Sequence, residues 1–155
     1  MTRINLVDPY LLADQHLFAE WREIKHIPAA AYRSLQSKSI QEVLKRIPKE
    51  FTLNKGHITF FMDKIDFLSI RYMELTRELE VRGYTLSEAS FENFNEWIAK
   101  LPDELFRSSW QPDAKARATS VERILLRIGQ KPQWYRHYGK QQTMEYYTEM
   151  LEGKK

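Results

Sequence analysis

Hydrophobic residues recur with the period of an α-helix along most of the sequence. The most regular stretch runs from Phe61 to Arg82, with apolar residues at alternating spacings of four and three: Phe61, Ile65, Leu68, Tyr72, Leu75 and Leu79. This spacing puts their side chains on one face and predicts a long helix packed against the core along its whole length. Gly83 stands where glycine commonly ends a helix.

Other helices are predicted between residues that commonly begin or end them. Asp8 and Pro9 are typical of a helix start, and this helix is expected to reach Lys25 and end before Pro28. The remaining segments are an interrupted helix over Ala29–Arg46, a loop over Pro48–Ile58, helices over Ser90–Lys100 and Asp113–Ile128, and a polar tail from Gln141 that is compatible with a helix. Because strand-like alternation is nearly absent, we expect an all-α fold. It would be a single compact domain of three long helices with shorter helices and irregular loops.

Composition narrows the class of protein. The 155 residues make one domain of usual size, and 43% hydrophobic and 29% charged residues are typical of a soluble globular protein. The absence of cysteine excludes disulfides, thiolate zinc sites and cysteine nucleophiles. No run reaches the roughly 18 apolar residues of a membrane span, and no signal-peptide apolar region is present. We therefore expect a cytoplasmic protein, with one domain over residues 1–140 and a short polar extension over residues 141–155.

Positive charge is concentrated in one part of the chain. The formal net charge is +3, yet seven basic residues between Ala114 and Lys140 face a single acid, Glu122. Such a segment on a near-neutral body is typical of a protein with a polyanionic partner, nucleic acid first and an anionic membrane second. The charge pattern alone is equally compatible with a solvated helix face.

Two predicted helices each present an apolar face and a chemically distinct one. On the first, one side carries Tyr10, Ala13, Leu17, Trp21 and Ile24. A second side gathers polar residues around the small Ala19: Gln15, His16, Arg22, Glu23 and His26. On the helix over Asp113–Ile128, the expected core edge is Ala114, Ala118, Val121, Leu125 and Ile128. A separate edge carries small residues that lead to two arginines: Ala116, Ser120, Arg123 and Arg127.

The sequence contains no strong metal-binding motif, but it contains one unusual candidate nucleophile. It has no glycine-rich phosphate loop and no His-Glu-x-x-His motif, and a metal pair of His16 with Glu20 or Glu23 is a weak alternative. Removal of the initiator methionine would free the α-amine of Thr2, whose reference pKa of about 7.7–8.0 leaves a fraction neutral at pH 7. Nearby arginines lower that pKa further, and a neutral amine attacks aldehyde-like carbons to give a Schiff base. A Met-Thr start by itself is equally compatible with no chemistry.

Three blocks of sequence resemble the phage pyrimidine-dimer DNA glycosylase (endonuclease V) family. They occur in the family's order: Met1–Leu6 with Ala13–Leu17 and Ala19–Glu23, then Gly56–Lys64, then Pro132–Lys140. The stretches Ala30–Leu53 and Gly83–Ala114 match the family poorly or not at all, and the tail from Gln141 extends beyond it.

The resemblance implies a compact all-α enzyme with two activities on damaged duplex DNA. Such an enzyme cuts the glycosidic bond of the 5′ pyrimidine in a cyclobutane dimer and then cleaves the backbone by β-elimination. By resemblance, the amine of Thr2 attacks deoxyribose C1′ and forms an imine, while Glu23 stabilises positive charge on the sugar and moves protons. This chemistry needs no cofactor and no metal.

The resemblance also implies a DNA-binding groove, with no membrane partner, in a monomer that would associate with the nucleoid through DNA. Its residues are Arg3, Gln15, His16, Arg22, His26, Arg123 and Arg127; the family has arginine at the place of His26. The last block alternates aromatic and cationic residues, which suits either stacking and phosphate contact or packing of a chain end on the core. Its candidates are Trp134, Tyr135, Arg136, His137, Tyr138 and Lys140.

Three other functions remain open from the sequence. The first is a glycosylase and lyase that uses the same amine on another base lesion, because lesion choice depends on the shape of the groove. The second is a non-catalytic helical DNA-binding protein, for which neither Thr2 nor Glu23 would be needed. The third is a protein-interaction module, which would leave the polar face of the first helix without a purpose.

Overall fold

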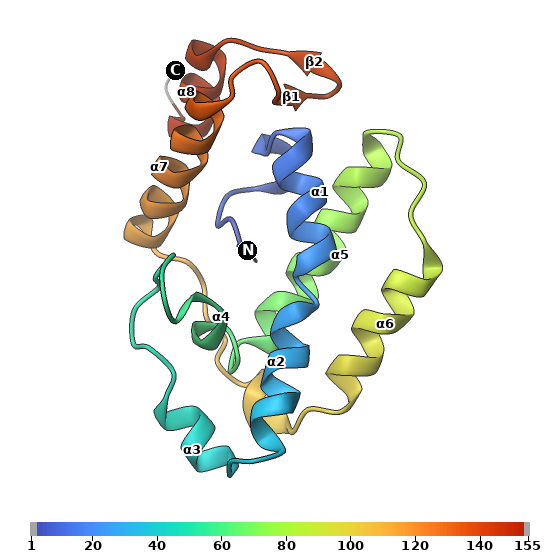
Figure 1. The fold of residues 1–155 in the computed structure, drawn as a ribbon, viewed down its shortest axis with the longest axis vertical. Coiled ribbons are helices and arrows are strands. Elements are labelled where there is room, and N and C mark those ends of the chain that lie inside the picture. The colour runs from blue at the N-terminus through green and yellow to red at the C-terminus, as the bar shows by residue number, and fades with distance from the viewer. Residues whose placement is uncertain (1–2, 154–155) are drawn as a thin grey trace.

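The computed structural model describes residues 3–153 and confirms the all-α fold (Figure 1). The helices are α1 (Asp14–Glu23), α2 (His26–Leu35), α3 (Ile40–Lys45), α4 (His57–Phe60), α5 (Ile65–Val81), α6 (Glu88–Ala99), α7 (Ala114–Gln130) and α8 (Met144–Glu152), with 3-10 turns η1 (Pro9–Leu11) and η2 (Asp103–Phe106). A short antiparallel hairpin joins α7 to α8, formed by β1 (Arg136–His137) and β2 (Lys140–Gln141). The interrupted helix expected over Ala29–Arg46 is present as α2 and α3.

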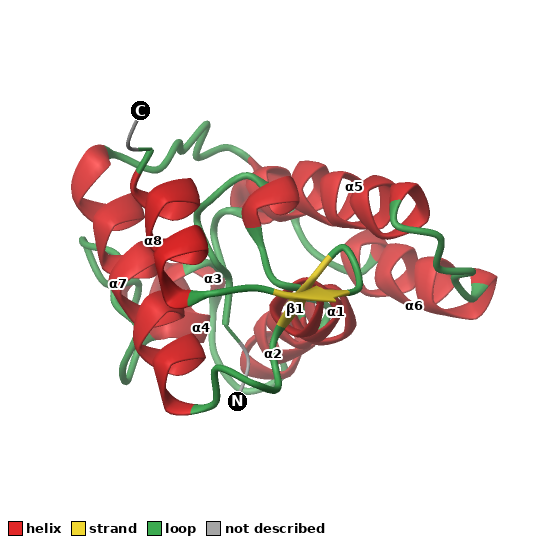
Figure 2. Cartoon of the chain, turned by 90° about the horizontal axis from the view of Figure 1, so that it is seen from above, coloured by secondary structure: helices red, strands yellow, loops and turns green. Residues whose placement is uncertain are grey.

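The helices lie in three layers. Figures 1 and 2 show α7 and α8 on one side, α1 and α2 in the middle, and α5 and α6 on the other side. The N-terminal segment, dark blue in Figure 1, runs between α7 and α1. Consequently residues 4–7 lie inside the molecule, where they contact helices on both sides.

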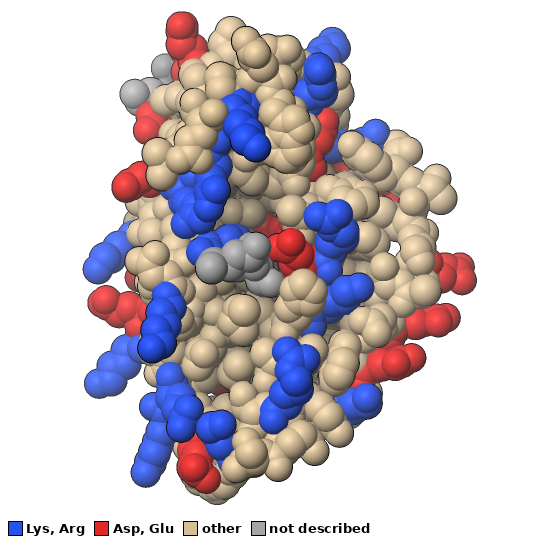
Figure 3. Space-filling view, in the orientation of Figure 1, with Lys and Arg blue, Asp and Glu red and all other residues tan. Residues whose placement is uncertain are grey.

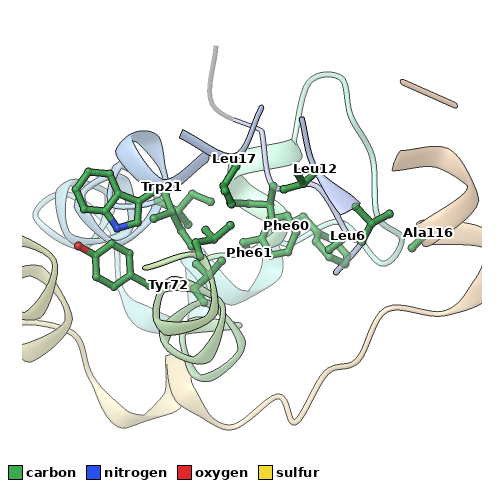
Figure 4. Close-up of a cluster of buried hydrophobic side chains, with 14 of the residues drawn as sticks. Leu6, Leu12, Leu17, Trp21, Phe60, Phe61, Tyr72 and Ala116 are labelled. Atoms are coloured by element: carbon green, nitrogen blue, oxygen red, sulfur yellow. The ribbon is translucent and has the colours of Figure 1, made fainter. Parts of the chain in front are cut away.

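The predicted seam of α5 forms the centre of the core. Ile65, Leu68, Leu75 and Leu79 are fully buried, and Figure 4 shows Tyr72 and Phe61 close to side chains of α1. The helix begins at Ile65 and not at Phe61, because Phe61 ends the separate turn α4. The helix ends as expected, since Gly83 has a φ of +96° and the amide of Tyr84 donates to the carbonyl of Leu79.

The first predicted helix begins later than expected, and Tyr10 is not buried with the other apolar residues of its predicted side. Residues Pro9–Leu11 form a 3-10 turn, the backbone is extended at Leu12, and Tyr10 is 54% exposed. Arg82 explains the break, because its guanidinium donates to the backbone carbonyls of Pro9, Tyr10 and Leu12. A continuous helix would have used these carbonyls for its own hydrogen bonds.

The predicted core edge of α7 is wrong at its N-terminal end. Ala114 and Ala118 are exposed, and Val121 and Leu125 are only partly buried. The buried edge consists instead of Ala116, Ser120, Ile124 and Ile128. The reason is the N-terminal segment, which packs on this edge and whose Leu6 amide donates to Ser120 Oγ at 3.1 Å.

The last helix covers part of α7. Tyr147 and Leu151 of α8 are buried in this contact, and Thr143 caps the helix by accepting a hydrogen bond from the Tyr146 amide. Within residues 3–153, no helix combines the length and the apolar character needed to cross a membrane.

Candidate nucleic-acid interface and active site

A groove of about 390 Å³ opens between α1 and α7, beside the N-terminal segment. Ala19 lines it, as expected for a small residue that leaves room for a ligand. In Figure 3, blue Lys and Arg side chains stand on both sides of this face, over α7 and over α1 and α2. Eight of the predicted site residues line the groove together: Arg3, Gln15, His16, Glu23, Arg123, Arg127, Trp134 and Tyr135.

The other predicted site residues lie outside the groove lining. Arg22 and His26 are exposed, and the Arg22 guanidinium carbon is 5.4 Å from the centre of the Phe18 ring. The hairpin carries the exposed Arg136, Tyr138 and Lys140 and the buried His137. Thr2 lies outside the described residues.

Three arginines give the groove a concentrated positive charge. Burial lowers the pKa of Arg3, and the positive charges of Arg123 and Arg127 lower the same pKa further. The carboxylate of Glu23 partly offsets this decrease. Burial and the neighbouring Arg127 lower the pKa of Arg123 in the same way. Guanidinium groups are effectively always charged in proteins. Such a cluster attracts phosphate groups and disfavours any further positive charge beside it.

His16 is a neutral residue in this cationic groove. Burial lowers its pKa to about 4, and the charges of Arg127 and Arg123 add to the effect. Its ring lies 4.7 Å from the ring of Tyr135, centre to centre. Its Nδ1 is buried and forms no hydrogen bond within the described residues. His16 therefore presents an uncharged ring, tilted against that of Tyr135, and not a phosphate-binding cation at neutral pH.

The C-terminal block contains one side chain packed on the core and another that stays exposed at the groove. Gln15 attaches it to α1, since its side chain donates to the carbonyl of Trp134 at 2.8 Å and accepts from the amide of Arg136 at 3.0 Å. His137 packs inward, with its ring nitrogens 2.8 Å from the carbonyl of Tyr10 and from the hydroxyl of Tyr146. Trp134, by contrast, is 56% exposed at the edge of the groove.

Sequence reasoning missed the residues that hold the N-terminal segment. The segment Ile4–Val7 pairs with no strand in the part of the chain that the structure describes, although all four residues are buried. Its backbone groups form hydrogen bonds with side chains instead. The amides of Ile4, Asn5 and Leu6 donate to His57 Nε2 at 2.9 Å, Glu20 Oε1 at 3.1 Å and Ser120 Oγ at 3.1 Å, respectively. The carbonyls of Asn5 and Val7 accept from Arg71. Four helices, α1, α4, α5 and α7, each contribute one of these side chains, which we call the N-terminal cradle.

A buried ion pair lies at the centre of the N-terminal cradle. Arg71 Nε is 2.7 Å from Glu20 Oε2, and both side chains are nearly inaccessible to solvent. Asn5 adds a side-chain hydrogen bond to the same carboxylate at 3.0 Å. One signal could have revealed the pair, because Arg71 stands between Leu68 and Leu75 on the apolar seam of α5. A charged residue at such a position requires a buried partner.

The described residues offer no site for a metal ion. Among residues 3–153, no three His, Asp or Glu side chains lie close enough together to hold one.

Taken together, the fold and site define an all-α protein with an acidic residue inside a cationic groove, an arrangement suited to a nucleic-acid substrate. The model of the pyrimidine dimer DNA glycosylase family matches residues 1–91, which is more than half of the chain. The chain therefore belongs to the pyrimidine dimer DNA glycosylase family, and the resemblance inferred from the sequence is confirmed. The match includes Arg3, Gln15, His16 and Glu23, whereas α7 and the hairpin follow it.

Proposed function

We propose that this pyrimidine dimer DNA glycosylase also acts as an AP lyase, and that both steps pass through an imine on the α-amine of Thr2. The observation that carries the proposal is the common lining of one groove by Arg3 and Glu23. Arg3 is the neighbour of Thr2 in the chain, and Glu23 lies close enough to raise the pKa of Arg3. The carboxylate proposed to act in catalysis and the residue that follows Thr2 therefore line the same cationic groove.

The first step breaks the glycosidic bond. The neutral amine attacks C1′, and the bond between C1′ and the base breaks with its electron pair leaving on the base, which takes up a proton. The nitrogen, positively charged after the attack, then loses a proton. Its lone pair forms the iminium as the bond between C1′ and O4′ breaks and O4′ takes up a proton. Glu23 stabilises the positive charge that develops on the sugar and transfers protons at this stage.

The second step breaks the DNA backbone. Glu23 removes a proton from C2′, which the iminium has made acidic, and the bond between C3′ and its phosphate oxygen breaks. The phosphate leaves with that electron pair, and water then hydrolyses the imine to release Thr2. The three groove arginines favour the amine over the ammonium form, since a second positive charge beside them is unfavourable.

Borohydride trapping tests the imine directly. Protein whose N-terminus has been sequenced as Thr2 is incubated with a duplex that carries one defined cyclobutane thymine dimer, and with the undamaged duplex. We expect a covalent adduct with the damaged duplex alone, and the same yield in EDTA because an imine needs no metal.

Glu23→Gln is the matched variant for this experiment. The amide has the size of the carboxylate but cannot accept a proton, so we expect retained binding of the damaged duplex and loss of strand cleavage. Absence of an adduct from correctly processed wild-type protein would exclude Thr2 as the nucleophile. An adduct with duplexes carrying other lesions, and not with the dimer, would assign the same chemistry to a different substrate.

A further inference from the structure

His57 is held in one orientation at the edge of the N-terminal cradle. It follows Gly56, whose φ of +99° forms the turn into α4 and where a Cβ would lie 3.2 Å from Pro48 Cγ. The rings of Phe51 and Phe61 contact the imidazole edge-on, at centre-to-centre distances of 5.5 and 5.3 Å. His57 is only 2% exposed, so packing leaves its ring little freedom to rotate.

The two hydrogen bonds of His57 determine its protonation. Nδ1 lies 2.7 Å from the carbonyl of Thr52, which can only accept, so Nδ1 carries the hydrogen. Nε2 is then a lone pair and accepts from the amide of Ile4 at 2.9 Å. Burial lowers the pKa of His57 to about 4, and the nearby Arg3 and Arg123 contribute to this shift. The ring is therefore a neutral acceptor at physiological pH.

We propose that His57 is a positioning residue that places the reactive amine of Thr2 by binding the backbone amide of Ile4. This inference rests on the proposed imine mechanism. Ile4 is two residues from Thr2, and because consecutive Cα atoms are about 3.8 Å apart, fixing Ile4 limits how far the amine can move from the groove. The remaining cradle bonds hold Asn5, Leu6 and Val7, farther from the reactive end. His57 does not touch the substrate, and its contribution is the orientation of the nucleophile.

Two amide substitutions separate this role from simple packing. In His57→Gln, Oε1 can take the place of Nε2 and accept from Ile4, whereas the shorter side chain of His57→Asn cannot reach it. The matched control is Ser39→Ala, which removes the capping bonds of α3 far from the groove. Imine formation is measured as the single-turnover rate of borohydride trapping at saturating enzyme, on a duplex with one abasic site. Affinity for the same duplex is measured by fluorescence anisotropy.

We expect His57→Asn to trap about tenfold more slowly than wild type, or slower still, with its affinity changed less than about twofold. His57→Gln should retain a rate within about threefold of wild type, as should Ser39→Ala. Equal rates for His57→Asn and wild type would overturn the proposal, as would equal losses in the two amide variants or a parallel loss of affinity. If His57→Asn does not fold, His57→Leu replaces it, and failure of both to fold would assign His57 to folding and also overturn the proposal. Wild-type protein that gives no adduct would instead refute the imine mechanism itself.

Discussion

Two segments, one near each end of the chain, border the same groove but are built in opposite ways. At the N-terminal end, the backbone of Ile4–Val7 is buried and bonded by side chains from four helices. Near the C-terminal end, the hairpin is attached to the rest of the molecule by hydrogen bonds of Gln15, Asp14 and His137. Trp134, just before the hairpin, stays 56% exposed. In the N-terminal segment the backbone itself is held by side chains from the helices. In the C-terminal segment the hydrogen bonds hold the hairpin in place while Trp134 stays exposed to solvent.

This difference fits what each segment would do in the proposed reaction. A nucleophile at the end of a chain must be oriented, and terminal residues are poorly ordered unless the chain near them is bound. A surface that follows a DNA duplex needs exposed aromatic and cationic groups on a stable support. We therefore expect substitutions in the N-terminal cradle to change stability strongly, and substitutions in the hairpin to change binding more than stability.

The largest expected effect is that of Arg71→Met. It leaves the Glu20 carboxylate buried without its ion-pair partner, and breaking such a pair costs about 3–5 kcal/mol of unfolding free energy. Urea unfolding measures this loss. The control is Arg77→Met on the exposed face of the same helix, with an expected change within about 0.5 kcal/mol. Equal effects of the two variants would contradict the importance of the cradle.

Acid should weaken the cradle through His57. Its pKa is about 4 in the folded protein against an ordinary value of 6.5, so below pH 6.5 the unfolded chain binds a proton that the folded protein does not. The unfolding free energy therefore falls as the pH decreases from 6.5 to 4, by up to about 3 kcal/mol from this residue. Comparing urea unfolding of wild type and His57→Gln across this range isolates the effect. Parallel pH profiles would show that His57 is not neutral in the folded state.

Gln15→Ala should have a moderate effect that is confined to the hairpin. It removes two hydrogen bonds between α1 and the hairpin, which together contribute about 1–2 kcal/mol. Hydrogen exchange of the Arg136 amide should accelerate, while that of the Ile4 amide should not change. Gln36→Ala, which loses a single bond within its own helix, is the control. Accelerated exchange at Ile4 would indicate that the two ends of the chain are coupled.

Trp134→Ala should have the smallest effect on the unfolding free energy but should lower the affinity for DNA. Its ring is largely exposed, so we expect the unfolding free energy to change by less than about 0.5 kcal/mol. If the ring stacks on a base, affinity for the damaged duplex falls by about 5-fold to 150-fold, and Trp134→Phe retains much of it. Anisotropy titrations measure this, with the exposed Leu126→Ala as control. Unchanged affinity would show that Trp134 does not contact DNA.

Several elements were predictable because their signals are local. The seam of α5, its end at Gly83 and the break between α2 and α3 followed from spacing and from known helix-ending residues. The start of α1 and the buried edge of α7 were not predictable in this way. Arg82 and the N-terminal segment decided them through contacts with residues far away in the sequence.

The candidate site shows the same contrast between features with local signals and features set by contacts far apart in the sequence. The sequence by itself determined the all-α fold, because periodicity can be read locally. Its resemblance to a known family added the family itself and most of the charged residues of the groove. Only the tertiary structure decided that His137 packs inward, that Gln15 binds the hairpin, and that His57 bonds to Ile4 across 53 positions. Such bonds form because a buried backbone group must find a partner wherever the fold provides one, and no local pattern specifies which residue that will be.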